Sequence, residues 1–164
     1  KENDYKTVEF AKMCEDSGAS LISIHGRVRD KIYSGDCNFG EIEKAKKAVR
    51  IPVIANGGIF SKEDADIMMD RTGADGVMIA RGAMSNPLIF SEILHKEPKI
   101  SIKEVVKKHL NLLIKRYGED RSAVIFRKQM SFYLKGIYDS KKFKERVFSA
   151  NNSQEVFKII EECF

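Results

Sequence analysis

Three short segments of the sequence combine glycine with side chains that could hold an anion. They are HGR at 25–27, NGG at 56–58 and ARG at 80–82, and each follows a short apolar run. Glycine permits positive φ angles and lets backbone N–H groups approach a ligand, while arginine can hold a phosphate through two parallel hydrogen bonds. The last two segments therefore predict a phosphate site. A plain strand-to-helix turn at NGG and a surface salt bridge of Arg81 are the alternatives.

The elements that must position these segments repeat one pattern, a helix followed by a glycine or proline and then a short strand. The expected strands are LISI at 21–24, IPVIA at 51–55 and GVMIA at 76–80. Continuously apolar strands that alternate with amphipathic helices predict an α/β fold with a parallel sheet buried on both faces. Because the carboxyl ends of parallel strands meet at one edge, the glycine segments would lie together there.

The helix expected between the second and third strands has a signal at each end. Ser61 followed by Asp64 resembles a capping box, in which each side chain bonds the backbone of the other residue. Gly73 is the type of residue that ends a helix in the left-handed conformation. We therefore expect the helix to lie between Ser61 and Gly73.

The composition changes near Pro98. Residues 1–94 carry a net charge of −2 and residues 95–164 a net charge of +7. We predict a boundary there, with an α/β region over 1–98 and a second domain over 99–164. Such a charge asymmetry suggests that the second domain meets a polyanion.

The second domain has helical rather than strand periodicity. Three apolar stripes are expected to form its core, namely Ile102, Val105, Leu112 and Leu113, then Phe126, Met130, Tyr133, Leu134 and Ile137, and finally Val156, Phe157, Ile160 and Phe164. Cations such as Arg127 and Lys128 lie among aromatic residues outside these stripes, which suits phosphate contacts with a nucleic acid. A merely solvated basic face is the alternative.

Composition excludes several classes of protein. With 43% hydrophobic residues the chain can form a core, and no apolar run approaches the roughly 18 residues of a membrane span. The first residues contain no hydrophobic signal segment, so we expect a soluble, cytoplasmic protein. Cys14, Cys37 and Cys163 form no CxxC pair, and we expect no metal site.

Four motifs, in order and at similar spacing, resemble those of the tRNA-dihydrouridine synthases. They are SIHGRVRDKIYSG at 23–35, IPVIANGGI at 51–59, GADGVMIARGAMSNPLIF at 73–90 and FRKQMSFYLKGI at 126–137. The first and last are the more specific, because other flavin and sugar-phosphate barrels share NGG and ARG. The resemblance covers nearly the whole chain.

The resemblance implies a fold and a cofactor. In this family FMN lies across the C-terminal mouth of a (β/α)8 TIM barrel, and a small α-helical domain that helps to hold tRNA follows the barrel. The chain would supply strands six to eight of the barrel over 1–98 and the helical tRNA-binding domain over 99–164. Carried over by motif, the residues around FMN would be His25, Asn56, Gly57, Gly58, Ala80, Arg81 and Gly82, and those facing tRNA would be Arg27, Arg29, Arg127 and Lys128.

The resemblance also implies a reaction in which NADPH reduces FMN and the flavin reduces a tRNA uridine to dihydrouridine. The proton-donor cysteine and the first five strands have no match here, so we expect no catalytic residue in this chain and an inactive fragment. Its partners would be tRNA and the missing N-terminal half of the barrel, with self-association through open strand edges possible. Another FMN-dependent barrel oxidoreductase with a small substrate and a stand-alone RNA-binding module are the alternatives.

Overall fold

The computed structural model describes residues 6–27 and 36–164. The chain divides into two compact units, Lys1–Gly82 and Ala83–Phe164. This division precedes the boundary that composition predicts at residue 98. The short helix α4 (Arg81–Ser85) spans the division, and a second short helix, α5 (Ile89–Ile93), lies between the two positions. Both helices precede the change in net charge near Pro98. The compositional prediction differs from the structure because the distribution of charge does not indicate which segments pack together.

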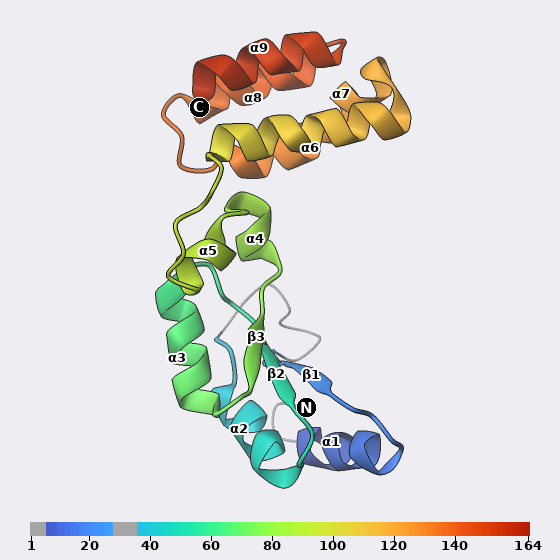
Figure 1. The fold of residues 1–164 in the computed structure, drawn as a ribbon, viewed down its shortest axis with the longest axis vertical. Helices are drawn as coiled ribbons and strands as arrows, with labels where there is room; N and C mark the ends of the chain where they lie inside the picture. The colour runs from blue at the N-terminus through green and yellow to red at the C-terminus, as the bar shows by residue number, and fades with distance from the viewer. Residues whose placement is uncertain (1–5, 28–35) are drawn as a thin grey trace. The chain divides into compact units, whose positions relative to one another are not determined.

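The first unit contains three parallel βα units, as predicted. The strands β1 (Ile22–His25), β2 (Val53–Asn56) and β3 (Gly76–Met78) pair in that order, with β2 in the centre (Figure 1). Helix α1 (Thr7–Asp16) precedes β1, and the helices that connect the strands are α2 (Phe39–Ala48) and α3 (Lys62–Thr72). Helix α2 packs against both α1 and α3. The fold is the α/β arrangement expected for the last part of a TIM barrel.

Both signals that bound α3 are confirmed. The Ser61 side chain accepts a hydrogen bond from the Asp64 amide, and the Asp64 carboxylate accepts one from the Ser61 amide. Gly73 ends the helix in the left-handed conformation at φ +62°. These local interactions fix where α3 begins and ends.

The register of the strands separates two faces of the sheet. Val53 and Ala55 are fully buried on one face. The alternate residues form the other face, where Ser23 and Met78 are exposed. The prediction of strands buried on both faces is therefore wrong for β1 and β3, because no second layer covers that face among the described residues.

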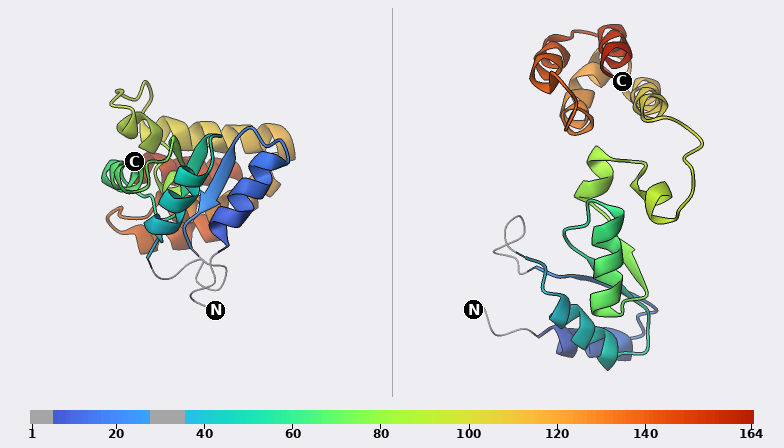
Figure 2. Two further views of the ribbon diagram at one scale, coloured as in Figure 1. Left: turned by 90° about the horizontal axis from the view of Figure 1, so that it is seen from below. Right: turned by 90° about the vertical axis from the view of Figure 1, so that its left-hand side faces the viewer.

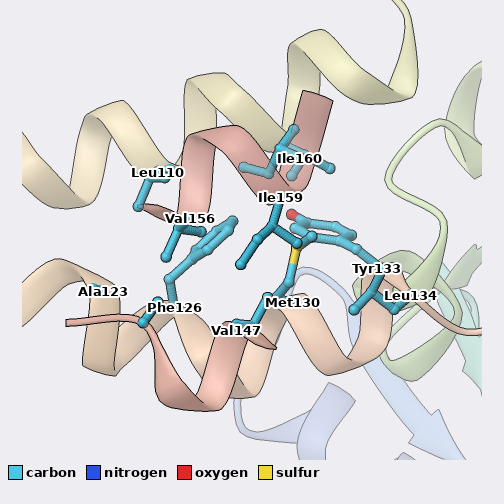
Figure 3. Close-up of a cluster of buried hydrophobic side chains, with 12 residues drawn as sticks. Leu110, Ala123, Phe126, Met130, Tyr133, Leu134, Val147, Val156, Ile159 and Ile160 are labelled. Atoms are coloured by element: carbon cyan, nitrogen blue, oxygen red, sulfur yellow. The ribbon is translucent and has the colours of Figure 1, made fainter. Parts of the chain in front are cut away.

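The second unit is built from four longer helices, α6 (Ile102–Tyr117), α7 (Glu119–Tyr133), α8 (Ser140–Ser149) and α9 (Ser153–Cys163). Helix α7 packs against α6, α8 and α9, and Figure 2 shows several of these helices nearly end-on. Their buried side chains meet around Phe126 and Met130 (Figure 3). Three of these helices were predicted, and α8 is an addition.

The core positions of α6 differ in part from the prediction. Leu112 is 58% exposed, whereas Val106 and Leu110 are fully buried. These two residues follow Ile102 at steps of four, which places all three on one side of the helix. Leu112 lies two residues further on and faces away from the core.

Candidate functional site

A cavity of about 210 Å³ lies at the carboxyl ends of the three strands. It brings together seven of the residues that the sequence analysis singled out, namely His25, Arg27, Asn56, Gly57, Gly58, Ala80 and Arg81. Ile59, Phe60 and Met78 complete its wall, and no sequence motif marked them as site residues. The strand ends thus converge on one pocket, as expected for a parallel sheet.

Asn56 joins the ends of all three strands. Its backbone carbonyl accepts a hydrogen bond from the Gly26 amide at 2.8 Å, and its side-chain Nδ2 donates to the Met78 carbonyl at 2.6 Å. The Met78 carbonyl can only accept, so the orientation of the Asn56 amide is fixed. Its Oδ1 lies 2.6 Å from Nδ1 of His25 and must accept a hydrogen bond from the N–H of that nitrogen. The neutral His25 ring therefore keeps Nε2 as its hydrogen-bond acceptor.

The loop after β2 needs both of its glycines. Gly57 has φ +135° and Gly58 has φ +72°, values that side chains rarely tolerate. No residue that the structure describes accepts a hydrogen bond from the backbone amide of Gly57 or Gly58. A Cβ on Gly58 would lie 3.0 Å from Nη2 of Arg27, so the Arg27 guanidinium lies directly beside this loop. Gly57, Gly58 and the Arg27 guanidinium thus line the same cavity.

The ARG segment contributes Ala80 and Arg81 to the pocket wall and Gly82 to backbone packing. The Arg81 guanidinium lies over the Phe60 ring, 5.4 Å from its centroid, and both residues line the cavity. Gly82 does not line it. A Cβ on Gly82 would meet the Ile59 carbonyl oxygen at 2.3 Å, so glycine is required there for close contact between two backbones.

The N-terminus of α3 is already occupied by a carboxylate. The amides of Phe60 and Ser61 donate to Oδ2 of Asp64 at 2.8 and 3.1 Å. An anion at the pocket would therefore meet the glycine amides and the arginines rather than the first turn of this helix.

Cys37 lies next to Gly26 and Gly57, a proximity that no sequence motif indicated. A Cβ on Gly26 would meet the Cys37 sulfur at 2.1 Å, and one on Gly57 would meet it at 3.1 Å. Burial raises the pKa of the Cys37 thiol, and the charge of Arg27 lowers it in part. The thiol is neutral at physiological pH and fills space beneath the loop.

The other predicted cationic residues lie in different surroundings. Arg127 donates from Nη2 to the Ala150 carbonyl at 3.0 Å, and its Nε is buried without an acceptor among the described residues. Lys128, the next residue, is exposed. Arg29 lies outside the described residues. Within the described part of the chain, no helix is long and apolar enough to cross a membrane, and no cluster of ligating side chains could hold a metal ion.

Fold and pocket together define an α/β protein with an arginine- and glycine-lined cavity at the ends of parallel strands, joined to a helical unit. The sequence profile of the dihydrouridine synthase (Dus) family matches residues 1–164. The chain therefore belongs to this family, as the motifs predicted.

Individual relatives agree with this assignment. The chain is 36% identical over 163 residues to the probable tRNA-dihydrouridine synthase 1 of Synechocystis sp., covering 94% of this chain and 46% of the relative. It is 38% identical over 152 residues to the tRNA-dihydrouridine synthase B of Vibrio parahaemolyticus, covering 87% of this chain and 47% of the relative. The chain thus spans about half the length of these curated relatives.

Proposed function

We propose that the chain is the C-terminal portion of a flavin-dependent tRNA-dihydrouridine synthase, which reduces uridines in cytoplasmic tRNA with NADPH as the reductant. The observation that carries this proposal is a cavity lined by Arg27, Arg81 and the pair Gly57 and Gly58, whose amides have no acceptor among the described residues. Amides without acceptors, flanked by guanidinium groups, are the donor set that a phosphate monoester needs. Family membership makes FMN the phosphate ester to expect.

The dimensions of the pocket support a partial cofactor site. Sites for small molecules usually enclose about 300–1,000 Å³, and this cavity of about 210 Å³ is smaller. It has room for the phosphate end of FMN and a part of the adjoining chain. The remaining wall would come from the N-terminal half of the barrel, which adds its strands to β1 and β3.

The residues of this chain bind and orient the cofactor. The Arg81 guanidinium and the amides of Gly57 and Gly58 would hold the phosphate of FMN, with Ala80 beside them. The close backbone packing at Gly82 would keep these residues in place. His25 would present Nε2 toward the flavin ring, because Asn56 holds Nδ1. When bound, FMN would supply hydride transfer. We assign the proton donor to the missing N-terminal portion, because none of Cys14, Cys37 and Cys163 stands in a motif that matches the family's proton-donor cysteine.

The helical unit would hold tRNA through its positive charge. The net charge of +7 over residues 95–164 favours phosphate contacts and makes affinity fall with salt. Lys128 is exposed on α7 and suits this role. Arg27, which lines the cavity, would contact tRNA as well, and the motif assigns the same role to Arg29.

Flavin titration of the full-length protein tests the cofactor site. A charge-assisted hydrogen bond is worth about 1.5–3 kcal/mol, so Arg81→Ala should weaken FMN binding by roughly tenfold to a hundredfold. Arg71→Ala is the matched control, since the Arg71 guanidinium lies over the Phe39 ring outside the cavity. An unchanged FMN affinity for Arg81→Ala would contradict the proposed phosphate site.

Activity is tested by mixing this chain with a separately expressed N-terminal half. We expect dihydrouridine in tRNA, measured by mass spectrometry of nucleosides, only when both halves, FMN and NADPH are present. Turnover by this chain alone would show that one of its own residues donates the proton. NADPH oxidation that tRNA does not stimulate would favour an oxidoreductase with a small substrate instead.

A further inference from the structure

The most exposed aromatic side chain of the described residues is Tyr138, in the connection between α7 and α8. Its exposed fraction is 89%, larger than that of any other large hydrophobic side chain in the described parts of the chain. Aromatic side chains usually bury most of their area against the protein. The solvent exposure of the Tyr138 ring therefore calls for a functional explanation.

The connection that carries Tyr138 is held firmly on both sides of it. Leu134 is fully buried, and Ile137 packs against the core of the helical unit. The Ile137 amide bonds the Leu134 carbonyl at 3.3 Å, and the Ser140 amide bonds the Ile137 carbonyl at 3.2 Å. The turn is anchored by packing and hydrogen bonds on both sides, so its backbone conformation places the Tyr138 side chain in solvent.

Backbone conformation strengthens this point. Gly136 has φ +85° and Asp139 has φ +55°, so left-handed residues stand on both sides of Ile137 and Tyr138. Positive φ is uncommon for residues other than glycine, although aspartate tolerates it better than most. Two such turns send the chain around Ile137, whose side chain enters the core while Tyr138 points outward.

The charges next to Tyr138 are almost all positive. Residues 135–144 contain Lys135, Lys141, Lys142 and Lys144 and a single acid, Asp139. Lys141 and Lys142 are exposed in the first turn of α8. An exposed ring beside exposed ammonium groups combines a stacking surface with phosphate contacts.

We propose that Tyr138 is a stacking platform for an unpaired base of the RNA substrate, with Lys141 and Lys142 holding the phosphates next to that base. This inference rests on the proposed function, which supplies RNA as the partner. Single-stranded and looped RNA is recognised by splayed bases on aromatic rings and by cations along the backbone. Because tRNA presents both loops and stems, Tyr138 would select for its unpaired parts.

Binding to two RNA probes tests the stacking role. The full-length protein is titrated with an unmodified tRNA transcript and with a blunt RNA duplex that has no unpaired bases. Tyr138→Ala should weaken transcript binding by between about fivefold and a hundredfold, as measured for base stacking elsewhere. Duplex binding should stay within about twofold, and Tyr138→Phe should retain the wild-type affinity because it keeps the ring.

Salt dependence separates stacking from charge. Stacking releases no counterions, so Tyr138→Ala should leave the slope of log affinity against log salt unchanged, whereas Lys141→Ala should reduce it by about one. Leu112→Ala is the control, because Leu112 is also an exposed apolar residue of the helical unit. Thermal unfolding should be the same for Tyr138→Ala and wild type, since the ring makes little contact with the core.

The outcomes distinguish this inference from the proposed function. Normal transcript binding by Tyr138→Ala would overturn the stacking role and leave tRNA binding intact. An equal loss for the transcript and the duplex would also overturn it, because a duplex offers no base to stack. If the wild-type protein does not bind the transcript at all, both the stacking role and the proposed RNA partner fail.

Discussion

Nδ1 of His25 donates a hydrogen bond to Oδ1 of Asn56 over 2.6 Å, which ties the end of β1 to the end of β2. The same amide donates to the Met78 carbonyl, so one side chain connects three neighbouring strand ends. Asn56 is therefore a positioning residue for the pocket, and its hydrogen bonds decide which nitrogen of His25 faces a ligand.

Replacement of Asn56 by alanine should lower the free energy of unfolding by about 1–3 kcal/mol, because it leaves the part-buried Met78 carbonyl and an imidazole nitrogen of His25 without partners. Chemical denaturation measures this loss. Nitrogen chemical shifts of the His25 ring should also show a mixture of tautomers in the variant and a single Nδ1–H form in the wild type. Asn111→Ala, at an exposed position of α6, is the control and should have little effect on either measurement.

Gly82 and Gly73 should respond differently to alanine, although both are glycines near a helix end. A Cβ on Gly82 would overlap the Ile59 carbonyl, so Gly82→Ala should cost about 1–3 kcal/mol or more through backbone displacement. A Cβ on Gly73 would meet no atom within 4 Å, and the left-handed φ of +62° alone should cost about 1–2 kcal/mol. Gly82→Ala should also weaken FMN binding. A Gly82→Ala protein as stable as the wild type and with normal FMN affinity would contradict the close packing inferred at Gly82.

The stability of the helical unit should depend on pH through His109. Its Nδ1 lies 3.0 Å from the Tyr133 hydroxyl, and its ring meets Phe126 edge to face. Burial lowers the pKa of His109 from its ordinary value of 6.5. Below 6.5 the unfolded chain therefore binds more protons than the folded chain, and the free energy of unfolding should fall as pH falls until the folded pKa is passed.

Denaturation of wild type and His109→Gln across this range isolates the contribution of His109, because the other titrating groups are common to both proteins. The wild type should lose more stability on acidification than the variant does. Parallel pH profiles would show that His109 titrates alike in the folded and unfolded chains.

Lys128 and Arg127 are neighbours in sequence, but their substitutions should have different effects. Lys128→Ala should weaken tRNA binding and reduce the salt slope by about one without changing stability, because Lys128 is exposed. Arg127→Ala should weaken tRNA binding as well. In addition it should lower the free energy of unfolding by about 1 kcal/mol, since it removes the hydrogen bond to the Ala150 carbonyl. Filter binding at several salt concentrations, together with denaturation, separates the two effects. A stable Arg127→Ala protein would show that the Ala150 bond contributes little.

Local sequence signals were sufficient for the order of elements in the first unit. The capping box of Ser61 and Asp64 and the left-handed Gly73 act within a few residues of each other, so their effect does not depend on the rest of the fold. The strands are short apolar runs between such signals, and glycine after each of them pointed to the ligand-binding edge. Family motifs added the cofactor and the partner, which periodicity alone does not indicate.

The relationships that shape the site arise only when distant segments meet. The partners His25 and Asn56 are 31 residues apart, and the Cys37 sulfur reaches Gly57 from a different connection. Burial of Arg127 depends on the end of α8, a helix whose few apolar residues made it hard to recognise in the sequence. Hydrogen bonds and backbone contacts of this kind are set by the distances between packed elements. The sequence by itself therefore determined which residues stand at the strand ends, and the tertiary structure decided which of them line the cavity, which orient a neighbour and which only allow two backbones to approach.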